Sequence, residues 1–196
     1  ETSGNIQTII MEYLIHIAIL ISIYAILGLS LNLVVGFTGL LSVTQAAFYG
    51  IGAYTTAILL TSTGINFFPA ILISIIITGI ISFGIGFVLS KFKDDYYALG
   101  SFGFNVIIYS IFINWQSLTR GPLGIPGIPR PSLFGFTFSE NIWFLALSIV
   151  CALVVYLFCR YITNSSFGRV LKAIREDEQA IQTFGYRTLW YKLTIF

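Results

Sequence analysis

Polar residues that could do chemistry are few in this chain of 196 residues, and none of them forms a catalytic pattern. His16 is the only histidine, which excludes a metal site built from paired histidines. No Ser-His-Asp arrangement, HExxH motif or phosphate-binding loop is visible in the sequence. We therefore expect no enzyme activity, no metal site and no cofactor.

A second group of polar residues carries no charge and lies within long apolar stretches. Its members are Asn32, Thr44, Gln45 and Asn105. Such side chains need hydrogen-bond partners, because an unpaired polar group in an apolar environment costs free energy. Hydrogen bonds between helices are the simpler explanation, and contact with a polar solute is the functional one. These four residues are the candidates for a solute pathway.

Charge is concentrated in residues 164–185, NSSFGRVLKAIREDEQAIQTFG, in a chain with only 9% charged residues. Four residues at i, i+3, i+4 and i+7 predict the apolar face of a helix: Phe167, Val170, Leu171 and Ile174. Ser165 or Ser166 can cap the start of this helix, and Gly185 can end it. The pattern predicts an amphipathic segment on the water side of a membrane.

Glu178 falls in the middle of the apolar face if this helix is continuous. Either the helix breaks near Arg175–Glu178, which we favour, or Glu178 is an acid held inside an interface. Lys172 and Glu176 are spaced to pair at i, i+4. Helices that lie on lipid are rich in Lys and Arg, and the acidic run 176–178 favours a protein partner instead. The predicted coupling residues are Phe167, Arg169, Lys172, Arg175, Glu176, Asp177 and Glu178.

The elements that position these residues are apolar helices. The chain is 57% hydrophobic, and residues 13–90 contain no Asp, Glu, Lys or Arg. A helix needs about 20 apolar residues to cross a bilayer, so the fold class is an all-α, polytopic transmembrane bundle. We expect one domain over residues 1–196, with spans near 13–35, 40–60, 69–89, 96–113 and 142–158 and a further span starting near 189. The short link 36–39 predicts either a tight hairpin or a broken helix.

Lys and Arg give the orientation of these spans. Eight of the ten flank two loops that lie on the same side, and only Arg120 and Arg130 lie on the other. We therefore expect residues 164–185 in the cytoplasm, and the N-terminus and the loop 114–141 outside a cell inner (plasma) membrane. The loop contains four of the five prolines, so its run RGPLGIPGIPRP cannot be regular helix. A stiff connector is slightly favoured over a lid or docking surface.

Small residues recur on one face of two predicted spans. They include Ala46, Gly50 and Ala53 in the second span, and Gly79 and Gly86 in the third. Faces of this kind let membrane helices approach closely. Helix packing is therefore the predicted role of these five residues.

Three stretches of the sequence resemble a known family. They are LSLNLVVGFTGLLSVTQAAFYGIGAYTTAILL, YYALGSFGFNVIIY with LTRGPLGIPGIP, and SSFGRVLKAIREDEQAIQTFGYRTLWYKLTIF. Together they resemble the permeases of ABC transporters for branched-chain amino acids. The resemblance implies partners: cytoplasmic ATP-binding subunits that contact the segment 164–185, a second permease subunit and an external solute-binding protein, within a lipid bilayer and without nucleic acid.

The leading functional hypothesis is a permease subunit of an ATP-driven importer for branched-chain amino acids, working by alternating access. A urea or short-amide permease of the same superfamily is the first alternative, and a non-transporting membrane assembly subunit is an alternative of another class. A secondary transporter is disfavoured because the spans lack the charged residues that such proteins use. The chain starts without Met and stops within an apolar run at Phe196, so we expect a fragment that lacks the later spans.

Overall fold

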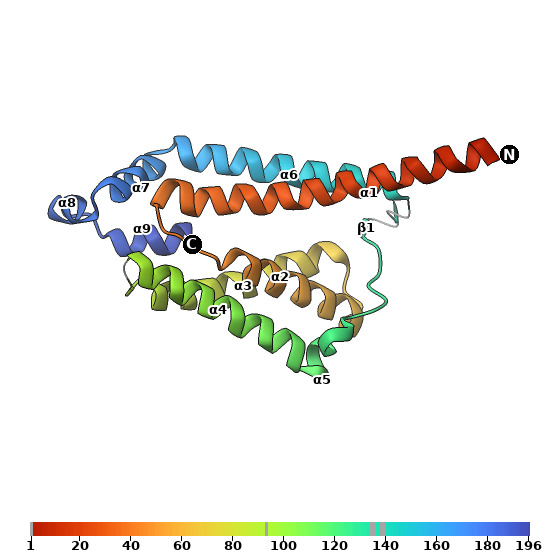
Figure 1. Ribbon diagram of the computed structural model, residues 1–196, viewed down its shortest axis with the longest axis horizontal. Helices are drawn as coiled ribbons and strands as arrows, with labels where there is room; N and C mark the ends of the chain where they lie inside the picture. Colours follow the sequence, from red (N-terminus) through yellow and green to blue (C-terminus); the bar gives the residue numbers. More distant parts are fainter. Residues whose placement is uncertain (1, 93, 134–135, 138–139) are drawn as a thin grey trace.

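Long apolar helices set the shape of the molecule (Figure 1). The computed structural model describes residues 2–92, 94–133, 136–137 and 140–196. Within these residues, four helical stretches are long and apolar enough to cross a membrane: Ile9–Gly36, Phe67–Leu89, Tyr96–Asn114 and Asn141–Asn164. They overlap the first, third, fourth and fifth predicted spans with somewhat different bounds, and that each of them crosses the membrane stays a prediction. The prediction of an all-α bundle of transmembrane type is confirmed.

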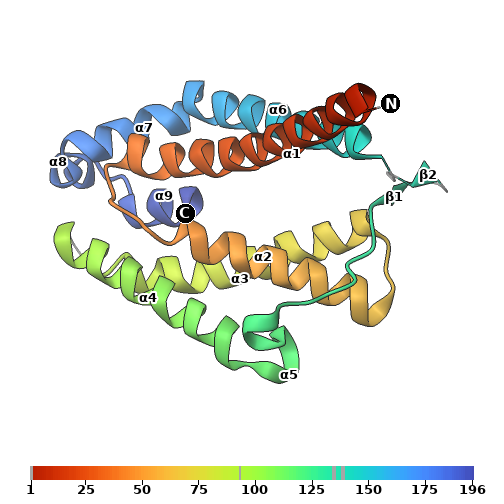
Figure 2. The same cartoon turned by 45° about the vertical axis from the view of Figure 1, so that its right-hand side comes forward.

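The helices form two groups that face each other. In the first group, α1 (Thr2–Leu31) and α6 (Asn141–Asn164) lie side by side and run in the same direction, as Figures 1 and 2 show. The second group contains α2 (Gln45–Ile58), α3 (Phe67–Leu89) and α4 (Asp94–Asn114). Three shorter helices gather at one end of the molecule: α7 (Ser166–Glu176), α8 (Glu178–Thr183) and α9 (Thr188–Ile195).

The chain reverses its direction between α1 and α2 (Figures 1 and 2), through a non-helical stretch that is longer than the tight hairpin predicted at 36–39. A π-helical turn, Asn32–Gly36, extends α1, and the residues from Gly39 to Thr44 are not helical. The Asn32 side chain fills the space beside Gly36, where a Cβ atom would lie 2.5 Å from Asn32 Oδ1. Gly39 has a φ of +71°, which favours glycine. The predicted second span, 40–60, is therefore wrong at its start, because α2 begins only at Gln45.

Side chains and neighbouring helices satisfy the backbone of this non-helical stretch. The hydroxyl of Thr38 accepts a hydrogen bond from the Leu40 N–H at 3.3 Å, and the buried Ser101 of α4 accepts one from the Val43 N–H at 3.2 Å. Ser42 and Thr44, both buried, share a hydrogen bond of 2.8 Å between their hydroxyls. Non-helical backbone is tolerated at membrane depth only where protein or water satisfies it, and here hydroxyl groups of the protein accept from the N–H groups of Leu40, Val43 and Thr44.

The connection between α4 and α6 is mostly irregular. It begins with a short helix, α5 (Gln116–Thr119), and a single 3-10 turn, Gly121–Leu123. Residues 124–131 then form no helix, as the prolines predict. The proline-rich run RGPLGIPGIPRP nevertheless contains the 3-10 turn near its start. A two-stranded antiparallel hairpin of β1 (Ser132–Leu133) and β2 (Phe136–Thr137) follows, and the sequence did not predict it.

The buried apolar residues gather in two places. One is α2, where Ala47, Phe48, Ile51 and Ala57 are buried, and the other is the end of the molecule that carries α7 and α9. Leu171 and Ile174 of α7 are buried there, together with Leu193 and Ile195 of α9. In contrast, α6 contains no buried residue of its own, and many large apolar side chains of α1, α3 and α6 are exposed. Such surfaces fit contact with lipid or with other membrane helices.

Candidate functional site

A cavity of about 380 Å³, largely open to the surface of this chain, lies between α2, α3 and the ring of Phe196. Its polar lining comes from Gln45 of α2 and from Ser74, Thr78 and Ser82 of α3, and Phe48 and Ile75 contribute apolar surface. The Ser74 hydroxyl donates to the Gly52 carbonyl at 2.8 Å. The Thr78 hydroxyl is buried and has no hydrogen-bond partner among the described residues. A mixed lining of this kind can accept a small amphipathic molecule.

The structure separates the four predicted solute-pathway residues. Only Gln45 lines the cavity, and its Oε1 accepts a hydrogen bond from Ser30 of α1 at 3.1 Å. Thr44 is fully buried, with its hydroxyl bound to Ser42. Asn32 is exposed on the π-helical turn, and Asn105 is half-buried on α4. A pathway role for these three residues stays a prediction.

Sequence reasoning missed Ser74 and Thr78, although a signal for them was present. The two residues are four positions apart in α3, so they lie on one helical face in an otherwise apolar segment. A pair of polar residues at that spacing indicates a helix face that contacts water or packs against another helix. The candidates predicted from the sequence, Asn32, Thr44, Gln45 and Asn105, include no residue of α3.

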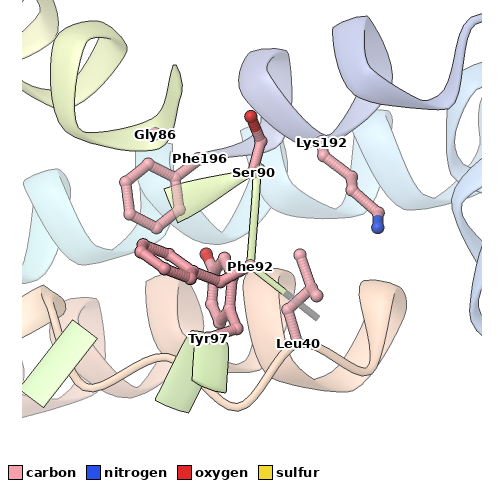
Figure 3. Close-up of a pocket in the computed structure, with 7 residues that line it drawn as sticks. All are labelled: Leu40, Gly86, Ser90, Phe92, Tyr97, Lys192 and Phe196. Atoms are coloured by element: carbon pink, nitrogen blue, oxygen red, sulfur yellow. The ribbon is translucent and has the colours of Figure 1, made fainter. Parts of the chain in front are cut away.

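A much smaller void of about 10 Å³ lies where α3, α4 and α9 meet (Figure 3). The rings of Phe92, Tyr97 and Phe196 surround it, and Lys192 approaches from the opposite side. This volume is at the lower limit for one water molecule. The void is therefore a packing feature and too small for a solute.

The small residues predicted to pack helices divide into two groups. A Cβ atom on Gly50 would lie 2.5 Å from Phe112 of α4, and one on Gly86 would lie 2.8 Å from Phe196. These two glycines permit close approach between helices. Ala46, Ala53 and Gly79 are exposed within this chain, so their packing role stays a prediction.

Two helices replace the single amphipathic helix at 164–185, as the position of Glu178 predicted. The break is at Asp177, whose backbone is extended with φ −154°. Asp177 caps α8 by accepting a hydrogen bond from the Ala180 N–H at 2.9 Å. Ser165 caps α7 through the Gly168 N–H at 3.4 Å. Gly185 ends α8 with φ +86° and donates its N–H to Gln182, a C-terminal cap of Schellman type.

Glu178 is also held in an interface, so both explanations for its position apply. Its Oε2 lies 2.6 Å from Lys192 Nζ of α9, and its Oε1 accepts a hydrogen bond from Thr188 at 2.9 Å. Phe167 of α7 stacks on Tyr191 of α9, with ring centroids 5.3 Å apart. These contacts attach α7 and α8 to α9. Glu178 and Phe167 therefore hold α7 and α8 against α9, and their side chains are not presented to solvent as docking groups.

Two further predicted coupling residues contact the connection between α1 and α2. Arg175 Nη1 donates to the Gly36 carbonyl oxygen at 2.7 Å. Lys172 Nζ lies 5.2 Å from the centroid of the Phe37 ring, a cation–π contact. The predicted pair of Lys172 with Glu176 is wrong, because no salt bridge joins these two described residues, and Glu178 pairs with Lys192 instead.

The outer surface of α7 and α8 combines charge with an exposed aromatic ring. Arg169, Glu176 and Asp177 are exposed, as the sequence predicted for docking residues. Phe184, directly after α8, is 78% exposed, and we had not singled it out. An apolar residue at the end of a charged amphipathic segment would have been the signal.

The residues of the chain from 13 to 196 match the family described as branched-chain amino acid transport system / permease component. The chain belongs to this family of permeases. Membership assigns it to a transport component rather than to an enzyme, and with its four apolar helices it is an integral membrane protein.

The permease is similar to curated proteins from bacteria and an archaeon. It is 35% identical to the high-affinity branched-chain amino acid transport system permease protein LivM of Escherichia coli K12, over 93% of this chain and 48% of that protein. It is 29% identical to the probable branched-chain amino acid transport permease protein LivM of Methanocaldococcus jannaschii, over 83% of this chain and 56% of that protein. The chain thus spans about half the length of the curated relatives it matches. No solved structure matches it.

Proposed function

We propose that the chain is part of the membrane-spanning permease subunit of an ATP-driven importer for branched-chain amino acids. The observation that carries this proposal is the family match over residues 13–196. The cavity between α2 and α3 supports it, because its volume of about 380 Å³ and its apolar walls suit an aliphatic side chain. Gln45, Ser74 and Thr78 offer groups that can hydrogen-bond the polar part of the solute.

ATP hydrolysis takes place, in this proposal, in separate cytoplasmic subunits that dock on α7 and α8. The exposed charges of Arg169, Glu176 and Asp177 and the exposed ring of Phe184 support a protein-binding surface there. A second permease subunit and an external solute-binding protein complete the importer. Solute crosses by alternating access, as movement of α7 and α8 opens one side of the cavity and closes the other.

The orientation proposed from the Lys and Arg distribution puts α7 and α8 in the cytoplasm and the N-terminus outside. The end of α3, two residues before Lys91, lies at the same end of the molecule as α7 and α8 (Figure 2), which supports this assignment. The membrane is the inner (plasma) membrane. A membrane-impermeant thiol reagent should label Asp177→Cys only in inverted vesicles; labelling from outside intact cells contradicts the orientation.

Uptake by the full-length permease tests the function directly. The permease, its companion permease, the ATP-binding subunits and the binding protein are reconstituted in proteoliposomes and supplied with radiolabelled leucine, isoleucine or valine. We expect saturable uptake that requires ATP hydrolysis. Uptake of urea or acetamide in place of the amino acids would move the assignment to short amides. An assembled complex that takes up none of these solutes would indicate an assembly subunit.

A further inference from the structure

Helix α7 contacts the connection between α1 and α2 at Gly36, Phe37 and Gly39. The Arg175 guanidinium donates to the Gly36 carbonyl oxygen at 2.7 Å, and the two residues are 139 positions apart in the chain. The aliphatic stem of Arg175 packs against Gly39, where a Cβ atom would lie 3.0 Å from Arg175 Cγ. Lys172, one turn earlier on α7, lies over Phe37. Both views show α7 beside the end of α1 at which these residues lie (Figures 1 and 2).

The Gly36 carbonyl group, which Arg175 contacts, lies where the regular α-helix of α1 is interrupted. Gly36 is the last residue of the π-helical turn, and π-helical turns are rare and frequent at functional sites. Gly39, in its left-handed conformation, follows three residues later. Regular helix resists local displacement, because each residue is tied to those four positions away. Among the described residues, the backbone of 40–43 makes no such bonds, so its position depends on the contacts that hold the stretch at Gly36 and at Val43.

The far end of the connection leads to the cavity. Val43 is tied to Ser101 of α4 through its N–H, and Thr44 immediately precedes α2. Gln45, the first residue of α2, lines the cavity and accepts a hydrogen bond from Ser30 of α1. Only nine positions separate Gly36 from Gln45. A displacement of Gly36 can therefore be transmitted through this short stretch of chain to Gln45 in the cavity wall.

We infer that Arg175 is a positioning residue that fixes the segment 36–44 to α7 and thereby sets the position of Gln45 in the cavity. The inference deepens the proposed function and rests on it for one consequence: movement of α7 by the ATP-binding subunits reaches the solute cavity through Arg175 and Gly36. Arg175 thus acts on the side of α7 that contacts Gly36 and Gly39, whereas Arg169, Glu176 and Asp177 are available for docking.

The test uses Arg175→Ala in the full-length permease, with Arg169→Ala as the matched control. Both arginines are exposed residues of α7 and their replacement removes the same charge, but the side-chain hydrogen bond of Arg169 among the described residues is to Ser166 within its own helix, at 2.8 Å. Hydrogen exchange followed by mass spectrometry reports on the amides of residues 36–44 without requiring transport. We expect about fivefold faster exchange there in Arg175→Ala, the effect of losing one charge-assisted hydrogen bond at an exposed site. Exchange in Arg169→Ala should match the unmodified protein.

Transport assays on the assembled importer give the second readout. In Arg175→Ala we expect the ATP-binding subunits to stay bound and to hydrolyse ATP, while solute uptake per ATP falls about fivefold, the lower range of typical coupling energies. Arg175→Lys keeps one donor within reach of Gly36 and should recover part of the coupling.

Three results would overturn the inference. They are equal exchange in the two alanine variants, loss of the ATP-binding subunits in Arg175→Ala, or unchanged uptake per ATP in that variant. Failure of the proposed function is distinguishable from these results, because the unmodified importer would then show no ATP-dependent uptake while the difference in exchange persisted.

Discussion

Lys192 and Glu178 form an ion pair between α9 and α8, with Nζ 2.6 Å from Oε2. Lys192 keeps only 15% of its side chain exposed and Glu178 keeps 33%. The second carboxylate oxygen accepts a hydrogen bond from Thr188, so both oxygens are used. The break at Asp177 turns Glu178 toward α9 instead of placing it in the apolar face of α7. The pair therefore fixes the direction in which α8 leaves α7.

Glu178→Gln should loosen α8 without changing its shape. The amide keeps the size of the side chain and can still accept from Thr188, but it leaves Lys192 without its carboxylate. For a half-buried pair we expect a loss of about 1 kcal/mol in local stability, or roughly fivefold faster hydrogen exchange of the α8 amides. Glu176→Gln, at an exposed position, is the control. Equal exchange in the two variants would show that the ion pair does not hold α8.

The sequence predicted this region well because its signals are local. A cap, a helix stop or a helix break depends on residues within one helical turn of it, and this holds for Ser165, Gly185 and Glu178. The partners of Arg175, Lys172 and Glu178 were not predictable in the same way. Gly36, Phe37 and Lys192 lie on other elements, and pairing with them depends on how the helices pack.

Gly168→Ala should distort the turn between α6 and α7. A Cβ atom on Gly168 would clash with the backbone carbonyl oxygen of Thr163 and would lie 2.7 Å from that of Ile162. Backbone atoms cannot rotate away as side chains do, so we expect a cost of about 2–3 kcal/mol and a lower midpoint of thermal unfolding in detergent. Gly103→Ala, which meets nothing within 4 Å, is the control. A midpoint unchanged from that of the control would show that α7 can shift at no cost.

The cavity was harder to predict than the helices around it. Gln45 was a candidate because a polar side chain beside a break in an apolar span is conspicuous. Ser74 and Thr78 belong to α3, and only the pairing of α3 with α2 brings them to Gln45. The start of α2 was misplaced for a similar reason. Residues 40–44 lie in an apolar stretch, but the left-handed Gly39 and the hydrogen bond from Val43 to Ser101 keep α2 from starting before Gln45.

Gly50→Ala and Gly79→Ala should have opposite effects on stability. Alanine is the better helix former by up to about 1 kcal/mol, and at Gly79 nothing within 4 Å opposes the added methyl group. At Gly50 the methyl group would meet Phe112, whose ring already stacks on Tyr54 with centroids 4.5 Å apart. We expect Gly50→Ala to lower the free energy of unfolding by about 1–2 kcal/mol and Gly79→Ala to raise it slightly. Thermal unfolding of both variants in detergent measures the difference, and equal midpoints would mean that α2 and α4 are not closely packed.

Phe184→Ala should weaken binding of the ATP-binding subunit and leave the fold intact. The ring is 78% exposed at the end of α8, so its removal costs the isolated permease little. A large apolar side chain beside exposed charges is typical of the residues that contribute most to protein interfaces. We expect the dissociation constant of the full-length permease and the subunit in detergent to rise about tenfold. Tyr161→Ala is the control, because Tyr161 is 76% exposed on α6, outside α7 and α8. If Phe184→Ala binds the subunit as tightly as Tyr161→Ala does, the docking surface does not include the end of α8, and the charged residues of α7 alone remain to form it.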